Sequence, residues 1–138
     1  MILLDTNIIS EMMKAAPSVQ VLKWMNQQKS VQLAISTITI AEIEYGINVL
    51  PDGKRRRYLE KAFSQTVNES FKHRIFSFDE SAAVLYGKWM GKRKNSGRPA
   101  SLLDGQIAAV ALANKMTLAT RNIRDFENSG LKLVNPFE

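Results

Sequence analysis

Three acidic residues in separate parts of the chain are the first candidates for chemistry. Asp5 directly follows the apolar run Ile2–Leu4, while Glu42 and Asp104 each lie near the start of a segment with helical periodicity. Carboxylates that converge from separate segments can bind a divalent cation or transfer protons. The three acids therefore indicate a hydrolytic or metal-binding site, provided that the fold brings them together.

The composition limits which metal such a site could hold. The 138-residue chain has no cysteine and one histidine, His73, which excludes thiolate sites and all-imidazole zinc sites. Carboxylate oxygens remain as ligands, and they suit hard ions. The sequence therefore predicts Mg²⁺ as the cofactor, with Mn²⁺ as a second candidate.

Each acid also has an explanation that involves no chemistry. Asp5 can cap the helix that begins at Thr6, and both Thr39–Glu42 and Ser101–Asp104 match a capping box, in which the acid bonds back to the first residue. Three carboxylates at one place would repel by about 3 kcal/mol per pair, at roughly 5 Å and an effective dielectric of about 20. A cation that reverses this repulsion explains their joint placement, whereas capping explains them only singly.

Packing neighbours give further hints about two of the acids. On a helix, Glu42 stacks beside Tyr45 and Val49, and a carboxylate among apolar neighbours is expected to need a partner. Glu44 competes with Glu42, and spacing alone hardly separates the two. The helical neighbours of Asp104 are alanines, which allow a close approach to the sheet and would bring Asp104 inward.

Short apolar runs alternate with longer segments of helical periodicity. Strands are predicted at 2–4, 31–35, 74–78, 117–119 and 131–134, where short β-branched or aromatic runs are bounded by polar residues. Helix-like segments follow Asp5 and cover 19–25, 40–50, 54–71, 82–90 and 102–114. This alternation is typical of a single α/β domain, residues 1–138, with a mainly parallel sheet of four or five strands.

The predicted sheet offers a way to bring the polar residues together. Functional groups in an open parallel sheet gather beyond the carboxyl ends of its strands. Asp5 follows the first strand, and Glu42 lies early in the helix after the second. Polar residues also follow the fourth strand, and they are Thr120, Asn122 and Asp125. Three strand exits are therefore expected to deliver polar groups to one edge.

The net charge of +6 suits a polyanionic partner such as nucleic acid, although it could equally serve solubility. The basic residues that could contact such a partner are Lys54–Arg57, Lys92–Lys94, Arg98 and Arg121.

Trp24 and Trp89 lie in apolar helical stripes and are predicted to be core or interface residues. No apolar run is long enough to span a membrane, and no leader is evident, so a cytoplasmic location without membrane contact is expected.

Four segments, in order along nearly the whole chain, resemble the motifs of the PIN-domain ribonucleases. They are Ile2–Asn7, Ser36–Glu42 with Gly46, Asp104–Ala109, and Ala119–Asn122 with Asp125 and Phe126. Within that family, the chain is most similar to the VapC-like and FitB-like toxins of bacterial toxin–antitoxin pairs. The resemblance implies a three-layer α/β/α domain with the first strand in the centre, and a homodimer.

The same resemblance implies roles for individual residues. It selects Glu42 over Glu44, and it implies that Asp5, Asp104 and Glu42 hold Mg²⁺ and hydrolyse RNA to products with a 5′-phosphate and a 3′-hydroxyl. The supporting residues are Thr6, Asn7, Thr120, Asn122 and Asp125, and the candidate RNA contacts are Arg121, Arg98, Lys54 and Arg55. The implied partner is a small antitoxin that covers the acidic groove and through which the complex would contact DNA.

One position departs from the common pattern. Many relatives carry a fourth acid where this chain has Asn122, and Asp125 is a candidate substitute for it. This departure supports an alternative, a PIN-like domain that binds nucleic acid without cleaving it. A phosphoryl-transfer enzyme with Asp5 as covalent nucleophile is disfavoured, because such sites usually need a second acid where Asn7 stands.

Overall fold

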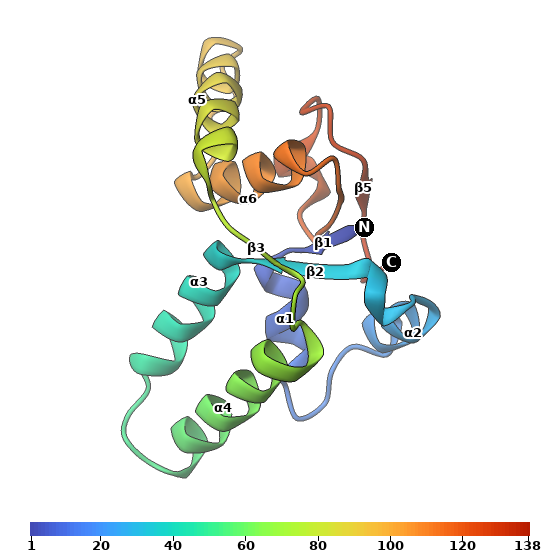
Figure 1. Cartoon of the computed structure of the whole chain (residues 1–138), viewed down its shortest axis with the longest axis vertical. Helices are drawn as coiled ribbons and strands as arrows, with labels where there is room; N and C mark the ends of the chain where they lie inside the picture. The colour runs from blue at the N-terminus through green and yellow to red at the C-terminus, as the bar shows by residue number, and fades with distance from the viewer.

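The computed structural model describes residues 1–138 and has one five-stranded sheet in which all strand pairs are parallel (Figure 1). The strands are β1 (Ile2–Leu4), β2 (Leu33–Ser36), β3 (Ile75–Phe76), β4 (Thr117–Ala119) and β5 (Leu133–Val134). Their order is β3-β2-β1-β4-β5, so β1 is central, as the resemblance implies. The predicted α/β class with a parallel sheet is confirmed.

Six α-helices and three shorter helical turns connect the strands. The α-helices are α1 (Thr6–Met12), α2 (Val19–Gln27), α3 (Thr37–Asn48), α4 (Lys54–Gln65), α5 (Glu80–Asn95) and α6 (Leu102–Ala113). The shorter turns are η1 (Ser30–Gln32), η2 (Thr66–Ser70) and η3 (Ile123–Phe126), of which η2 is a π-helix and the others are 3₁₀-helices. None of the helices is long and apolar enough to cross a membrane.

Alternate side chains of the strands pack into two separate cores, one on each face of the sheet. Leu3 and Leu118 belong to the core covered by α5 and α6, which is closed at one side by Phe126. Leu4 and Ala119 face the opposite core, formed with α1, α2, α3 and α4. Figure 1 shows α5 and α6 on one side of the sheet and α1, α3 and α4 on the other. The result is the expected three-layer α/β/α arrangement.

Several element boundaries differ from the predicted ones for local reasons. The second strand begins only at Leu33, because 30–32 form a 3₁₀ turn. The segment predicted at 54–71 divides into α4 and the π-turn η2. Helix α5 is longer than the predicted 82–90, because Asp79 caps its start by accepting a 3.0 Å bond from Ala82 N.

The end of α5 is fixed by a left-handed glycine. Gly97 has φ 74°, and its N–H donates to the Lys94 carbonyl at 3.0 Å, while the Arg98 N–H donates to the Arg93 carbonyl at 2.9 Å. This pair of bonds is a Schellman motif, for which glycine is the preferred residue. Helices α5 and α6 are in close contact at Gly105, where a side chain would collide with Met90 and crowd Tyr86. The small residues of α6 thus allow this helix to pack closely against α5 as well as against the sheet.

Candidate active site

Buried polar side chains form a row at the carboxyl edge of the sheet. The strand register pairs Leu4 with Ala119, so the residues that follow them, Asp5 and Thr120, lie side by side. It also pairs Leu3 with Ala34, so Ser36, two residues after Ala34, lies beside Asp5 on its other side. All three are buried, with Asp5 at 4% exposure and the other two at 0%. Parallel strands thus bring together residues that are far apart in sequence, as the strand-exit rule predicts.

Asp5 is the carboxylate of this row, and hydrogen bonds hold both of its oxygens. One oxygen, Oδ1, accepts from Thr6 N at 2.7 Å, so Asp5 is the N-cap of α1. The other, Oδ2, accepts from Thr120 Oγ1 at 2.7 Å and from Asn7 Nδ2 at 3.4 Å. Burial raises the pKa of Asp5 to about 6, against the lowering effect of the bonds from Thr120 and Thr6. The charges of Asp104 and Glu42 contribute smaller parts of this rise, so both carboxylates act on Asp5.

Glu42 is connected to this row through a chain of hydroxyl groups. Its Oε1 accepts from Thr6 Oγ1 at 2.8 Å, and Thr6 Oγ1 lies 3.0 Å from Thr39 Oγ1. Because the single Thr6 hydroxyl proton points to Glu42, the Thr39 hydroxyl must donate to Thr6. Ser36 Oγ in turn lies 3.5 Å from Thr39 Oγ1 as its donor. The hydroxyl groups of Ser36, Thr39 and Thr6 therefore form a series of hydrogen bonds in which each hydroxyl donates toward the Glu42 carboxylate.

The capping box suggested for Thr39–Glu42 is absent. Helix α3 begins earlier, and its N-cap is Ser36, whose Oγ accepts from Thr39 N at 3.2 Å. Glu42 therefore lies in the second turn, where it caps nothing. Two of its apolar helical neighbours, Tyr45 and Val49, are 72% and 61% exposed, so Glu42 is not enclosed by them.

Glu44 lies on a different face of α3. It is exposed, and its side-chain and backbone oxygens both accept from Asn48 Nδ2, at 3.4 and 2.8 Å. Of the two glutamates that competed for the site, Glu42 is the one that the fold places beside Thr6 and Asp5.

Asp104 reaches the site from the first turn of α6. Ser101 caps this helix and accepts from Asp104 N at 3.1 Å, which is the forward half of the predicted capping box. Burial raises the pKa of the Asp104 carboxyl, and Ser101 lowers it. Asp125 raises this pKa and Arg93 lowers it, so both charges lie within range of Asp104. The carboxylate is half-buried, in keeping with the expected inward position.

The three acids are near one another but do not form a closed metal cage. No group of three acidic or histidine side chains has the geometry to hold an ion. None of the ion pairs in the chain involves these acids, and those pairs are Lys14–Glu11, Arg56–Glu60, Arg57–Asp52 and Arg98–Glu127. The site thus contains partly buried carboxylate charge that no protein cation pairs with in a salt bridge, and Arg93 acts on Asp104 only from a distance.

The remaining supporting residues differ in how closely they contact the acids. Asn7 bonds to Asp5 and accepts from Arg121 N at 3.4 Å, so it links α1 to the segment after β4. Thr120 contacts Asp5 directly and accepts from Asn122 N at 3.1 Å. Asn122 and Asp125 are exposed, and Asp125 is linked to the site by its electrostatic effect on Asp104.

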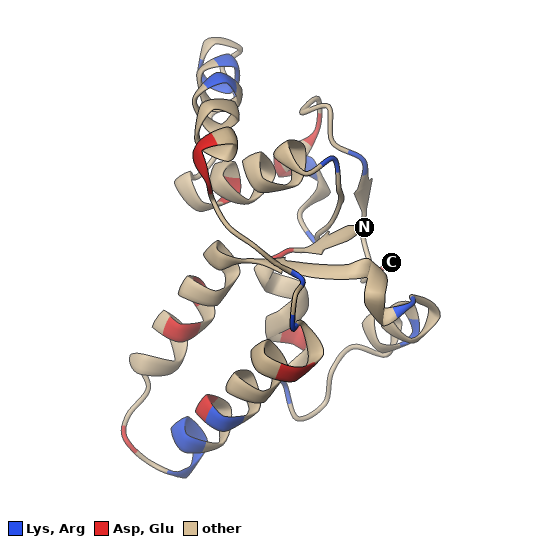
Figure 2. Ribbon diagram, in the orientation of Figure 1, with Lys and Arg blue, Asp and Glu red and all other residues tan.

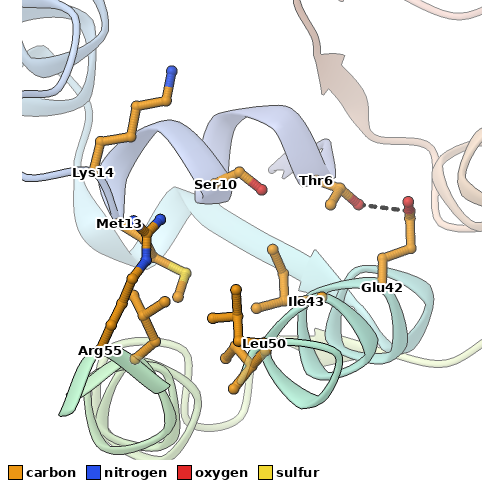
Figure 3. Close-up of a pocket in the computed structure, with 11 residues that line it drawn as sticks. Thr6, Ser10, Met13, Lys14, Glu42, Ile43, Leu50 and Arg55 are labelled. Atoms are coloured by element: carbon orange, nitrogen blue, oxygen red, sulfur yellow. Dashed lines mark hydrogen bonds between the residues drawn. The ribbon is translucent and has the colours of Figure 1, made fainter. Parts of the chain in front are cut away.

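A groove of about 380 Å³ extends from Glu42 along α1, α3 and α4 (Figure 3). Its floor is apolar, with Met13, Ile43 and Leu50 among its lining residues, and Arg55 and Lys14 lie at the end away from Glu42. One end of the groove is therefore acidic and the other basic. Of the predicted RNA contacts, Arg55 is the one that lines this groove.

The other basic residues are distributed widely. Figure 2 shows the two basic runs near opposite ends of the molecule, at the start of α4 and the end of α5. Lys54 and Arg121 are exposed, and the Arg121 guanidinium lies 4.6 Å from the centre of the Phe137 ring. Arg98 pairs with Glu127 at 3.6 Å. Arg93, predicted with its neighbours as a possible RNA contact, is instead buried.

Sequence reasoning missed Ser36 and Thr39 as site residues, and it assigned Arg93 a different role, that of a possible RNA contact. Ser36 ends β2, and Thr39 lies in the first turn of α3 directly after it, so the strand-exit rule could have found them. For Arg93 the signal was its helical spacing from Trp89, which places both side chains on the inner face of α5. Trp89 itself is buried, and Trp24 packs at the edge of the other core, as predicted.

Known proteins resemble this chain over its full length. Residues 2–130 match the PIN domain. Plasmid stability protein StbB of Pseudomonas syringae pv. tomato is 41% identical, and VapC ribonuclease Y4jK of Sinorhizobium fredii is 40% identical; both alignments cover 100% of this chain and 99% of the relative. Toxin FitB of Neisseria gonorrhoeae is 34% identical and covers 99% of each chain.

A solved structure agrees with these relatives. A chain in the structure of FitAB bound to an IR36 DNA fragment superposes with a TM-score of 0.94 at 35% identity, covering 100% of this chain and 96% of the other. Sequence match, fold and topology therefore point the same way, and this chain belongs to the PIN-domain family.

Proposed function

We propose that this protein is a Mg²⁺-dependent endoribonuclease and the toxin of a bacterial toxin–antitoxin pair. Its relatives include proteins named as a VapC ribonuclease and as the toxin FitB, each matched over nearly its whole length. The observation that carries the proposal is the buried Asp5 carboxylate beside Glu42 and Asp104, with its pKa raised to about 6 and no protein cation as partner.

The chemistry of the donor set fits a hard cation, while the three side chains as they lie do not enclose one. Every group offered by Asp5, Glu42 and Asp104 is a carboxylate oxygen, which is the ligand type that Mg²⁺ and Mn²⁺ prefer. Burial raises the pKa of Asp5, and a bound cation would favour its charged form, which supports the proposal. In this proposal Asp5 and Asp104 are direct ligands, and Glu42 binds directly or through a water molecule.

When bound, Mg²⁺ supplies a Lewis acid that stabilises the phosphate charge and lowers the pKa of water. The residues of the chain orient and exchange protons around it. Thr6, Thr120 and Asn7 hold the Asp5 and Glu42 carboxylates in place. Glu42, with its free oxygen, accepts a proton from the attacking water. Since no 2′-hydroxyl attacks, the products are a 5′-phosphate and a 3′-hydroxyl.

Basic residues around the acids are the proposed RNA contacts. Arg55 lines the groove that ends at Glu42, and Arg121 adjoins Thr120, which bonds to Asp5. Lys54 is an exposed residue of the basic run that begins α4, and Arg98 is an exposed residue that follows the basic run ending α5. Lys and Arg at such positions neutralise phosphates and release counterions.

The proposed protein partner is an antitoxin. The FitAB structure is described as bound to a DNA fragment, and by analogy this chain would contact DNA only through its antitoxin. An antitoxin covering the groove in Figure 3 would block access to Glu42. The homodimer, like the cytoplasmic location, stays a prediction.

The proposal is tested by incubating the purified chain with structured RNAs in Mg²⁺ and in EDTA. Cleavage should require the metal and leave 5′-phosphate ends. Glu42→Gln is expected to slow cleavage by about 10²- to 10⁴-fold, as for the loss of a general base, whereas Glu44→Gln, on the same helix, serves as the matched control with wild-type activity. RNA binding without any cleavage would contradict the proposal and favour the non-cleaving nucleic-acid-binding domain.

Thr6→Val tests the hydroxyl chain that ends on Glu42. The substitution keeps the side-chain shape but removes the donor to Glu42 and the acceptor for Thr39. We expect cleavage to fall about tenfold and the free energy of unfolding to fall by about 1 kcal/mol. Thr6→Ser keeps the hydroxyl and should retain both properties. Equal cleavage rates for the valine and serine variants would show that the chain does not orient Glu42.

A further inference from the structure

Arg93 is buried near the acids without a carboxylate partner. It is 9% exposed, and its guanidinium donates to two backbone carbonyls, Nη2 to Asp125 O at 2.8 Å and Nη1 to Glu127 O at 2.9 Å. Arginine remains charged in proteins, so this burial requires several favourable contacts. Its two neighbours in the basic run, Lys92 and Lys94, are exposed.

Aromatic rings hold the guanidinium from one side. The Arg93 Cζ lies 5.0 Å from the centre of the Trp89 ring, and Trp89 stacks on Phe126 with ring centres 6.3 Å apart and an angle of 23°. Phe126 is fully buried and ends η3. Arg93 therefore holds η3 through a hydrogen bond to its backbone, and Trp89 holds it by stacking on its one buried side chain, Phe126.

The segment that is gripped carries two of the supporting residues. Asn122 precedes η3, and Asp125 lies within it. The Asn122 N–H donates to Thr120 Oγ1, the same atom that donates to Asp5, so the position of this segment is coupled to the most buried acid. The carbonyl of Asp125 is directed at Arg93, while its charge acts on Asp104.

The anchor is itself rigid. The Arg93 carbonyl accepts from Arg98 N at 2.9 Å in the Schellman motif and from Ser96 Oγ at 2.9 Å. Arg98 adds a second, more exposed link to the same segment through its 3.6 Å ion pair with Glu127. The end of α5 is thus a fixed support for η3.

We propose that Arg93 is a positioning residue, which anchors residues 122–127 to α5 and thereby places Asn122 and Asp125 beside Asp104. Its planar fork spans two carbonyls at once, which a point charge such as lysine does not reproduce. It also supplies positive charge near Asp104 and Asp125 while staying out of contact with RNA. The anchoring of residues 122–127 by Arg93 does not depend on what the protein does, whereas the effect of Arg93 on cleavage rests on the proposed ribonuclease function.

Hydrogen exchange of the full-length, metal-free chain tests the anchoring directly. In Arg93→Met, the amides of Asn122 and Asp125 should exchange about tenfold faster or more, because the segment loses two charge-assisted hydrogen bonds. Lys88→Met removes the same charge from an exposed position of α5 and is the matched control. Unchanged exchange in a folded Arg93→Met protein would overturn the proposal.

Kinetics separate positioning from RNA contact. Arg93→Met should lower kcat about tenfold or more and leave KM within about twofold, as expected for an outer residue that orients the site. A raised KM with normal kcat would instead identify Arg93 as an RNA contact and overturn the proposal. If the chain does not cleave RNA at all, the exchange result still decides whether Arg93 anchors the segment.

Arg93→Lys covers the case in which the methionine variant fails to fold. It keeps the charge but not the fork, so we expect faster exchange of the Asn122 amide and a lower kcat here too. Wild-type exchange and kcat in Arg93→Lys would refute the role of the fork.

Discussion

Asp5→Asn is expected to lower the rate of RNA cleavage by about three orders of magnitude while leaving the chain folded. The substitution removes one negative charge from a carboxylate that forms no ion pair with a protein cation. Metal-ion stabilisation of a transition state contributes several kcal/mol, and a loss of about 4 kcal/mol corresponds to a factor of about 10³. The measurement is single-turnover cleavage of a defined RNA at saturating Mg²⁺.

The fold should survive because asparagine can replace most of the contacts of Asp5. Its side-chain oxygen can accept from Thr6 N or from Thr120 Oγ1, and asparagine caps helices about as well as aspartate. The substitution therefore separates the charge of Asp5 from its structural role as the N-cap of α1.

A second N-cap provides the control for this separation. Asp79 caps α5 by accepting from Ala82 N, and Asp79→Asn changes an aspartate cap in the same way without altering the acidic row. This variant should cleave RNA at the wild-type rate. If Asp5→Asn keeps more than about a tenth of the activity, or if both variants lose it equally, the charge of Asp5 is not what the reaction needs.

The parallel sheet and the position of Asp5 could be predicted because both depend on local pattern. Apolar runs alternating with helical segments specify parallel strands, and a polar residue at a strand exit can face only the carboxyl edge. The first and fourth strands are right to the residue. Asp5 and Thr120 meet because their strands are hydrogen-bonded neighbours.

Contacts made by helices were harder to predict, because a helix can be rotated or begun elsewhere without violating its periodicity. The start of α3 depends on Ser36 rather than Thr39, and this choice decides whether Glu42 caps the helix or faces Thr6. Arg93 belongs to a run of basic residues that suggests a solvated surface. Only the tertiary position of Phe126 and of the Asp125 and Glu127 carbonyls explains its burial.

The metal-free protein should lose stability as the pH rises through the range in which Asp5 titrates. Burial is the largest cause that raises its pKa from the ordinary 3.8 to about 6. Between these values the folded state keeps a proton that the unfolded state has released. The folded state then binds more protons, so the free energy of unfolding falls with rising pH, by about 3 kcal/mol in total.

Urea unfolding of wild type and Asp5→Asn from pH 3.5 to 7, without divalent metal, measures the contribution of Asp5 together with its coupling to Asp104 and Glu42, since titrating groups that do not interact with Asp5 cancel in the difference. Wild-type stability should fall relative to the variant by about 3 kcal/mol across this range, complete above about pH 6. Asp52→Asn, at an exposed position, serves as the control for removing a carboxylate elsewhere. Mg²⁺ at pH 7 should restore stability to the wild type and far less to Asp5→Asn, because a ligand stabilises only the state that binds it. A difference that stays flat with pH would mean that Asp5 carries no such charge strain, and the case for a cation beside it would lose its physical basis.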